Sequence, residues 1–119
     1  MAARRRADAR IVLVTAADEA QALALARALV ERRLAACVNV TGRVRSIYRW
    51  KGAVEEATEH ILIIKSRAAL IDKLVRAVRE LHSYDTPEVV AIPIVAGFRP
   101  YLDWLTDSTT AVRARRAAR

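Results

Sequence analysis

The side chains best suited to bind a metal are a single cysteine and two histidines. Cys37 lies in an extended apolar segment, where its thiolate is the softest ligand available and suits Cu(I) or Zn(II). The alternative for Cys37 is a small buried hydrophobic residue. His82 follows a predicted helix, whose dipole favours the protonated ring, and precedes a loop with Tyr84, Asp85 and Glu88. It is the best imidazole ligand candidate, although a helix-capping histidine in contact with water is the equal alternative, because no second histidine lies four residues away.

A carboxylate and an ammonium group alternate with apolar residues in one strand-like segment. Period-two spacing puts Glu59, Ile61, Ile63 and Lys65 on one face of that strand. Because partly buried charges need partners, Glu59 is a third candidate metal ligand and Lys65 is a candidate for a polar cleft. Structural ion pairing between subunits is the equal alternative for both charges. His60 lies in the same segment and is expected to be exposed or interfacial.

Aromatic side chains gather at two places in the sequence. Tyr48 and Trp50 lie beside a predicted hairpin tip, where they could stack on a ligand or seat the tip against a neighbouring subunit, and we favour the second interpretation. Tyr101, Trp104 and Leu105 form a stripe at helical spacing near the C-terminus. This stripe is expected to dock a short helix and is assigned no chemistry.

Hydrophobic periodicity predicts the elements that must position these groups. A short apolar run rich in β-branched residues is typical of a buried strand, and Thr41-Gly42 inside a longer extended segment indicates a bulge. Lys51-Gly52 is a tight-turn signal. The expected order is a strand over 11–15, a helix over 18–33, a bulged strand over 34–50, a strand over 54–66, a helix over 66–81, a strand over 89–95 and a short helix over 101–105.

Three residues predict how these elements begin or lie. Asp18 and Ser66 are each placed to accept a hydrogen bond from the first turn of a helix, as an N-cap does. Pro93 lacks a backbone N–H, so the last strand must lie at a sheet edge or carry a bulge.

The element order predicts an α+β fold: a ferredoxin-like βαββαβ sandwich with a long hairpin between its second and third strands and a short C-terminal helix. Both helices are expected on one face of the sheet. The second face and two edges are then bare, and the hairpin is too long for so small a domain to cover. Self-association would cover them.

The chain has 119 residues, which fits one domain, and a net charge of +8. Residues 1–10 carry four arginines and Asp8, and residues 111–119 carry four more arginines, so the part between them is nearly neutral. A basic charge confined to the ends favours solvated tails over a nucleic-acid surface. We therefore expect a basic disordered tail over 1–9, a folded domain over 10–108 and a basic tail over 109–119.

The sequence lacks the features of membrane and secreted proteins. No apolar run approaches the roughly 20 residues needed to cross a bilayer, and the first residues have no apolar stretch like that of a secretion signal. One cysteine cannot form an internal disulfide. We expect a cytoplasmic protein with no membrane partner.

Nothing in the sequence commits the chain to catalysis. It has three glycines and no glycine-rich loop before a helix, and no triad or paired carboxylates are evident. The loop after the first strand, Ala16 to Glu19, lacks the arginine that an acylphosphatase needs to bind an anion. The central strands lack the aromatic residues of an RNA-binding domain with this topology. We expect a binding protein and no enzyme.

Several motifs occur in the order found in a known family. They are Leu-Ala-Ala-Cys-Val-Asn over 34–39, Ser-x-Tyr-x-Trp-x-Gly over 46–52 and Tyr-x-Thr-Pro-Glu over 84–88. With them the chain, from residue 12 to about 108, resembles the CutA divalent-cation tolerance family. The family usually has His-Pro-Tyr where this chain has His82-Ser83-Tyr84, so a serine replaces the proline that fixes that loop.

The resemblance implies a homotrimer of ferredoxin-like subunits with PII-like architecture, in which the long hairpins pair between chains. It also implies binding of a divalent metal, copper especially, in metal tolerance. The alternative is a PII-like trimeric sensor or scaffold that binds a small metabolite in a cleft between subunits. The resemblance supports a polar pocket lined by Tyr48, Trp50, Glu59, Lys65, His82, Tyr84 and Glu88.

Overall fold

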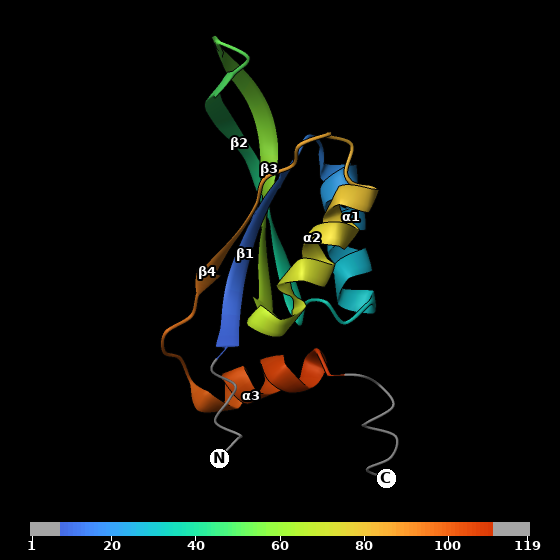
Figure 1. The fold of residues 1–119 in the computed structure, drawn as a ribbon, viewed down its shortest axis with the longest axis vertical. Helices are drawn as coiled ribbons and strands as arrows, with labels where there is room; N and C mark the ends of the chain where they lie inside the picture. Colours follow the sequence, from blue (N-terminus) through green and yellow to red (C-terminus); the bar gives the residue numbers. More distant parts are fainter. Residues whose placement is uncertain (1–7, 111–119) are drawn as a thin grey trace.

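The structure, a computed structural model, describes residues 8–110 as an α+β fold with a four-stranded sheet in the order β2-β3-β1-β4 (Figure 1). Neighbouring strands are antiparallel throughout this sheet. The predicted tails over 1–9 and 109–119 lie largely outside the described residues. The elements are β1 (Ala9–Ala16), α1 (Glu19–Glu31), β2 (Cys37–Trp50), β3 (Ala53–Arg67), the 3-10 helix η2 (Ala68–Leu70), α2 (Ile71–Leu81), β4 (Val89–Pro93) and α3 (Arg99–Ser108).

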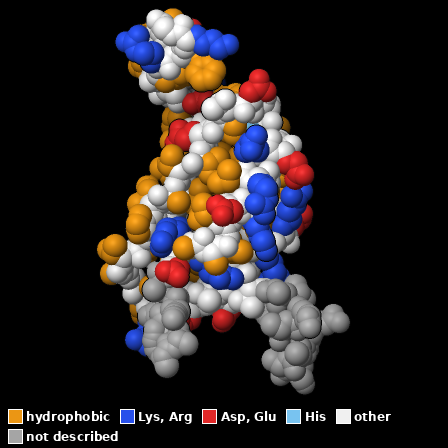
Figure 2. All heavy atoms as spheres, in the orientation of Figure 1, with side chains coloured by type: hydrophobic (Ala, Val, Ile, Leu, Met, Phe, Trp, Pro, Cys, Tyr) orange, Lys and Arg blue, Asp and Glu red, His pale blue; other side chains and the backbone are white. Residues whose placement is uncertain are grey.

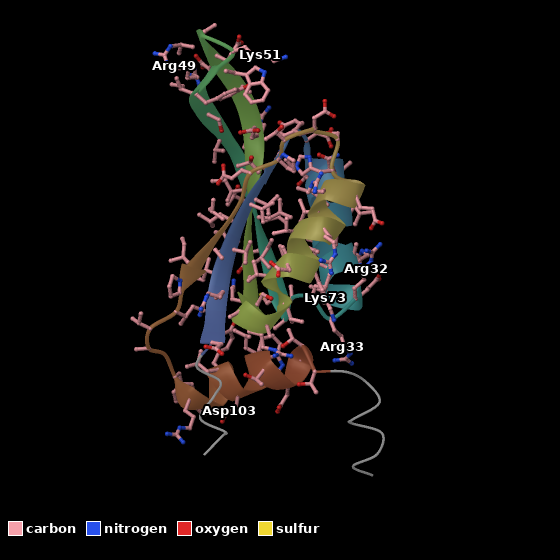
Figure 3. All side chains as sticks on the ribbon, in the orientation of Figure 1. Arg32, Arg33, Arg49, Lys51, Lys73 and Asp103 are labelled. Atoms are coloured by element: carbon pink, nitrogen blue, oxygen red, sulfur yellow. The ribbon has the colours of Figure 1, made fainter. Side chains whose placement is uncertain are left out.

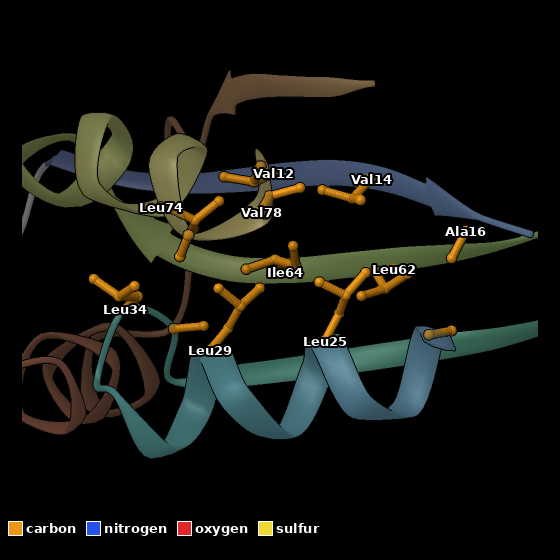
Figure 4. Close-up of a cluster of buried hydrophobic side chains, with 13 residues drawn as sticks. Val12, Val14, Ala16, Leu25, Leu29, Leu34, Leu62, Ile64, Leu74 and Val78 are labelled. Carbon is orange, nitrogen blue, oxygen red and sulfur yellow. The ribbon is translucent and has the colours of Figure 1, made fainter. Parts of the chain in front are cut away.

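This order confirms the predicted βαββαβ plan, and α1 and α2 cover one face of the sheet (Figure 1). Alternate residues of β1 and β3 point into that layer, as period-two spacing requires. Their side chains interdigitate with those of the two helices in one apolar cluster (Figure 4). Its fully buried members include Val12, Val14, Leu25, Leu29, Leu62, Ile64, Leu74 and Val78.

The opposite face of the sheet has no covering layer within residues 8–110. The strand register places Ile11 of β1 beside Ile92 of β4, and Leu13 beside Ile63 of β3 and Val90 of β4. These side chains are only partly buried or exposed, Ile92 with 45% of its surface accessible. The structure therefore has an apolar sheet face, here called the bare face, as the sequence predicted.

The β2-β3 hairpin extends well beyond the rest of the sheet and makes the chain elongated, 53 × 26 × 24 Å (Figure 1). The predicted bulge lies between Val40 and Arg43, where the register shifts. The predicted turn is also confirmed, because Lys51 and Gly52 have φ values of 50° and 83°, which a two-residue hairpin turn of the primed type requires. Since β1 ends at Ala16, opposite His60, everything beyond His60 in this hairpin lacks a β1 neighbour.

Helix α3 lies across the end of the sheet nearest the start of β1 (Figure 1). It is longer than the helix predicted over 101–105, and Pro100 in its first turn favours that earlier start. Leu105 is fully buried in a small cluster with Ala9 and Ala36, so the predicted docking is confirmed for this residue. No helix among the described residues is long and apolar enough to cross a membrane.

Of the predicted helix caps, one is confirmed and one is wrong. The Asp18 carboxylate accepts a hydrogen bond from the Gln21 N–H at 2.8 Å. Ser66 caps nothing, because β3 continues through it and η2 separates it from α2. Its hydroxyl instead donates to the Leu34 carbonyl at 2.7 Å and ties the entry of β2 to β3.

Two further expectations about strands meet different outcomes. His60, expected exposed or interfacial, is buried, and its Nδ1 lies 2.9 Å from the Thr41 carbonyl oxygen that the bulge presents. Pro93 ends β4, which pairs only with β1 and is the edge strand that Pro93 predicted.

Candidate functional site

The base of the projecting hairpin contains a pocket of about 740 Å³. The pocket forms where β1 ends and the loop between α2 and β4 passes beside the two hairpin strands. Figure 2 shows basic side chains at the hairpin tip and acidic side chains at the base of the hairpin. The lining residues are Thr15, Ser46, Ile47, Tyr48, Trp50, Lys51, Glu59, Tyr84, Asp85, Thr86 and Glu88.

Glu59 is the buried acid of this pocket, with only 7% of its surface accessible. The Tyr84 hydroxyl donates a hydrogen bond to its Oε2 at 2.8 Å. Glu59 forms no salt bridge with a lysine, arginine or histidine of residues 8–110, and its second oxygen accepts no hydrogen bond there. A carboxylate held away from water without a cation is costly, so this geometry favours a positively charged partner.

Tyr84 is held in its neutral form beside that carboxylate. Burial, the hydrogen bond to Glu59 and the negative charge of Glu59 raise the pKa of Tyr84 from 10.0 to about 12. The phenol is therefore a hydrogen-bond donor at physiological pH and contributes no negative charge to the pocket.

His82 supports Tyr84 from behind instead of facing the pocket. Its Nε2 lies 2.7 Å from the Thr15 carbonyl oxygen, and its Nδ1 lies 3.0 Å from the Tyr84 backbone nitrogen, which donates to it. Both ring nitrogens therefore have a backbone partner. Neither nitrogen is therefore open to a metal in this arrangement.

Ser83 takes the place of the proline expected in this loop. Its hydroxyl donates to the Gln21 side-chain oxygen of α1 at 3.1 Å. The loop is also fixed by contact between the His82 and Tyr84 rings, whose centroids are 4.6 Å apart. Hydrogen bonds and ring contact thus hold here a conformation that a proline would restrict through its own ring.

The hairpin side of the pocket is aromatic and half exposed. Tyr48 and Trp50 have 43% and 48% of their surfaces accessible. The Lys51 ammonium lies over the Trp50 ring, 5.9 Å from its centroid, within the range of a cation–π contact. Lys51 and Arg49 lie at the tip of the hairpin (Figure 3).

Cys37 and Lys65 lie at the open end of the hairpin, away from Glu59 in the middle of β3. They are partners in the β2-β3 register, and Lys65 is six residues from Glu59 along β3, which corresponds to about 20 Å in an extended strand. The Lys65 ammonium donates to the Asn39 side-chain oxygen, and the Cys37 sulfur is 3.9 Å from the same oxygen. A single chain therefore does not bring Cys37 or Lys65 to the pocket.

The chain matches a known protein family over most of its described residues. A family model described as CutA1 divalent ion tolerance protein matches residues 10–108. The chain belongs to the CutA1 family. It is 48% identical over 99 residues to the divalent-cation tolerance protein CutA of Thermus thermophilus, covering 83% of this chain and 96% of that protein.

Relatives from distant organisms match this CutA1 chain over similar lengths. Protein CutA of Homo sapiens is 44% identical over 99 residues, covering 83% of this chain and 55% of that protein, so the chain spans about half of the human relative. The solved structure of the Thermus thermophilus protein superposes with a TM-score of 0.84 at 47% identity, covering 86% of this chain and 99% of that one. That of CutA1 from Oryza sativa gives 0.83 at 41% identity, covering 86% and 94%.

In this CutA1 chain, five of the predicted site residues line one pocket: Tyr48, Trp50, Glu59, Tyr84 and Glu88. His82 reaches it only through Tyr84. Within residues 8–110 no group of three His, Cys, Asp or Glu side chains is close enough to hold a metal ion. The three predicted metal ligands, Cys37, His82 and Glu59, therefore do not form a metal site within one chain.

Some lining residues of the CutA1 pocket were not predicted as site residues. Asp85 and Thr86 lie in the loop that supplies Tyr84, and Ser46 precedes Tyr48 by two residues on the same strand face. Strand alternation could have found Ser46. Thr15 joins the pocket only because β1 ends there, which depends on the sheet register.

Proposed function

We propose that this CutA1 chain is a homotrimeric protein that binds a divalent cation, copper first among the candidates, and acts in metal tolerance without catalysis. Relatives whose names state a role are called divalent-cation tolerance proteins, which supports the cation class. The observation that carries the proposal for this chain is the bare face, because it is apolar and also bears candidate ligands.

Assembly is supported by the apolar character of that face. Exposed contiguous apolar surface is uncommon on monomers and is typical of an interface. The sheet order also leaves β2 and β4 as open edges within residues 8–110, and strand edges pair readily with other chains. A trimer would bury the face and give the projecting hairpin a neighbour to pack on.

Metal binding and assembly are connected through the position of Cys37. Strand alternation places Cys37 on the same side of the sheet as Ile63 and Leu13, whereas Val38 packs into the helix-covered core. Glu59 lies on this same side of the sheet, because it precedes Ile61 and Ile63 at period-two spacing along β3. Copies that pack through the bare face would bring ligands of different chains together, which the roughly 20 Å separation in one chain prevents.

Mass and titration test this proposal together. Light scattering is expected to give about three times the 13.2 kDa of one chain. Titration with Cu(I) under reducing conditions is expected to saturate at a whole-number ratio to trimer and to fail in Cys37→Ser, because a thiolate is the preferred ligand of Cu(I). Cu(II) under air tests Glu59 through Glu59→Gln, with Glu56→Gln, on the other face of β3, as matched control.

His82→Ala separates a ligand from a support. A lower copper affinity in this variant would mean that the ring leaves its backbone partners to bind the ion. If His82 only holds Tyr84 through its backbone hydrogen bonds, copper binding persists while the Tyr84 environment changes. A monomeric mass, or heats that do not saturate in any oxidation state, would refute the proposal.

A second candidate function is a sensor or scaffold that binds a small metabolite at the hairpin base. The pocket volume of about 740 Å³ favours it, because small-molecule sites are about 300–1,000 Å³ and a bare ion needs far less. Apolar and polar groups also converge there, with Trp50 and Tyr48 on one side and Glu59 on the other. In a trimer this pocket would open toward the neighbouring subunit.

A further inference from the structure

The pocket at the hairpin base has a net negative charge. Glu59, Asp85 and Glu88 line it against the single ammonium of Lys51. Asp85 and Glu88 are exposed to water and tolerate their charges alone, but Glu59 does not, because 93% of its surface is shielded. The Tyr84 hydroxyl gives Glu59 one hydrogen bond, and its other oxygen has no donor within the described residues.

The hairpin side of the same pocket already holds a cation. The Lys51 ammonium lies over the Trp50 ring, so the negative face of that indole is turned to where a positive group can reach it. Lys51 sits in an exposed turn on a flexible four-carbon stem, and a competing ammonium can displace it. Tyr48, on the same strand face as Trp50, adds a second aromatic surface.

A bare metal ion fits this arrangement poorly. A divalent ion needs several donor atoms converging within about 2–2.6 Å, and no three carboxylate, imidazole or thiol groups of residues 8–110 converge anywhere. The carboxylates come from separate segments, β3 and the loop before β4, around a volume of about 740 Å³. A charged group at one end of a larger apolar body matches this separation better.

We propose that this pocket binds an organic ammonium ion, an aliphatic amine whose ammonium group meets Glu59 and whose hydrocarbon part lies against Trp50 and Tyr48. The ammonium donates to the free oxygen of Glu59, while the Tyr84 hydroxyl keeps the other oxygen in place. Asp85 and Glu88 at the rim favour a second positive charge, so a diamine binds more tightly than a monoamine. This inference rests on the second candidate function, the metabolite site, and is independent of copper.

Trp50 provides the readout, because the chain has only two tryptophans. In a Trp104→Phe background of the full chain, Trp50 is the single indole, and 1,4-diaminobutane is titrated in buffer with a metal chelator. The fluorescence of Trp50 is expected to change saturably. Butane-1,4-diol, a neutral molecule of the same shape, is the matched ligand control and is expected to give no saturable change.

Glu59→Gln is expected to weaken diamine binding about tenfold or more, because it removes a charge-assisted hydrogen bond from a shielded site. Glu56→Gln, on the exposed face of the same strand, is expected to leave the affinity within about twofold. Equal affinities of the wild type and Glu59→Gln, or equal binding of the diol, would overturn the proposal.

A neighbouring subunit could instead supply the missing cation, with Lys65 as the candidate from the predicted cleft. In that case the wild type binds no diamine and Lys65→Met creates a diamine site, and this outcome overturns the proposal. The copper titration is read separately. Saturable copper binding without diamine binding would refute the amine site alone. Diamine binding in the presence of the chelator, without copper binding in the separate titration, would support the amine site and refute the metal-binding function.

Discussion

At the scale of single residues, the pair of Glu59 and Tyr84 determines the character of the pocket. The two residues are 25 positions apart and meet because the loop after α2 passes the end of β1. Tyr84 stabilises the Glu59 carboxylate by donation, and the carboxylate in turn keeps the tyrosine neutral. Replacing either residue should therefore change the ionisation or the hydrogen bonding of the other.

Replacing Glu59 by Gln is expected to lower the pKa of Tyr84 from about 12 and leave it above 10.0. The charge and its hydrogen bond are lost, while burial, the largest cause of the shift, remains. Titration of tyrosinate absorbance against pH measures the pKa of Tyr84. The chain has three tyrosines, and the transition that is missing in Tyr84→Phe is the one that belongs to Tyr84. An unchanged high-pH transition in Glu59→Gln would mean that Glu59 does not control Tyr84.

The same shift predicts a pH dependence of stability. The folded-state pKa of Tyr84, about 12, lies above its ordinary 10.0, so the folded chain keeps a proton that the unfolded chain releases. Its contribution is fully present below pH 10 and is lost between about pH 10 and 12. Urea unfolding across that window should show the wild type losing more stability than Tyr84→Phe, and parallel losses would contradict the assignment.

Some of these residue roles could be predicted from the sequence and others could not. Alternation along β3 correctly placed Ile61, Ile63 and Lys65 on one face, because that pattern is local. The way His82 is held was not predictable, since it depends on the Thr15 carbonyl 67 residues away. The helix dipole is a local signal and does not indicate this distant contact.

At the scale of elements, the hairpin is the part that its sequence specifies best. The bulge after Val40 and the Lys51-Gly52 turn both depend on adjacent residues, which explains why they were predicted correctly. The cap at Ser66 failed because its hydroxyl found a better partner in Leu34, 32 residues away. The length of α3 depends on its burial against Ala9 and Ala36, which no local pattern shows.

Gly52→Ala tests the turn. Its φ of 83° is strained for any L residue, and an added Cβ would meet nothing within 4 Å, so the cost is a backbone cost of about 1 kcal/mol. Gly42→Ala is the matched control, because its Cβ also meets nothing and no left-handed φ is required. The stabilities of the two variants are compared by their urea unfolding midpoints, measured at one fixed protein concentration. Equal midpoints for the two variants would mean that the turn does not require a glycine at position 52.

At the scale of the whole molecule, the fold leaves an apolar sheet face that no element of residues 8–110 covers. The helix layer buries Val12, Leu62 and their neighbours, while Leu13 and Ile63 from the same strands face away from it. Alternation made this second face predictable. Whether and how copies meet on this face depends on the shape of the whole surface, for which a single sequence carries no local signal.

Ile92→Glu tests whether copies pack through the bare face. Ile92 is 45% exposed, so a carboxylate there can stay in water and costs a single chain little, but in an interface it would be shielded without a partner. The proposed trimer should weaken by about 3–5 kcal/mol per buried charge, and light scattering should show a mass falling toward 13.2 kDa. Val30→Glu, equally apolar and 41% exposed but on α1, should leave the mass unchanged. If instead Val30→Glu dissociates the assembly and Ile92→Glu does not, the copies pack through the helix layer, and Cys37 ligands from different chains would have no route to a shared ion.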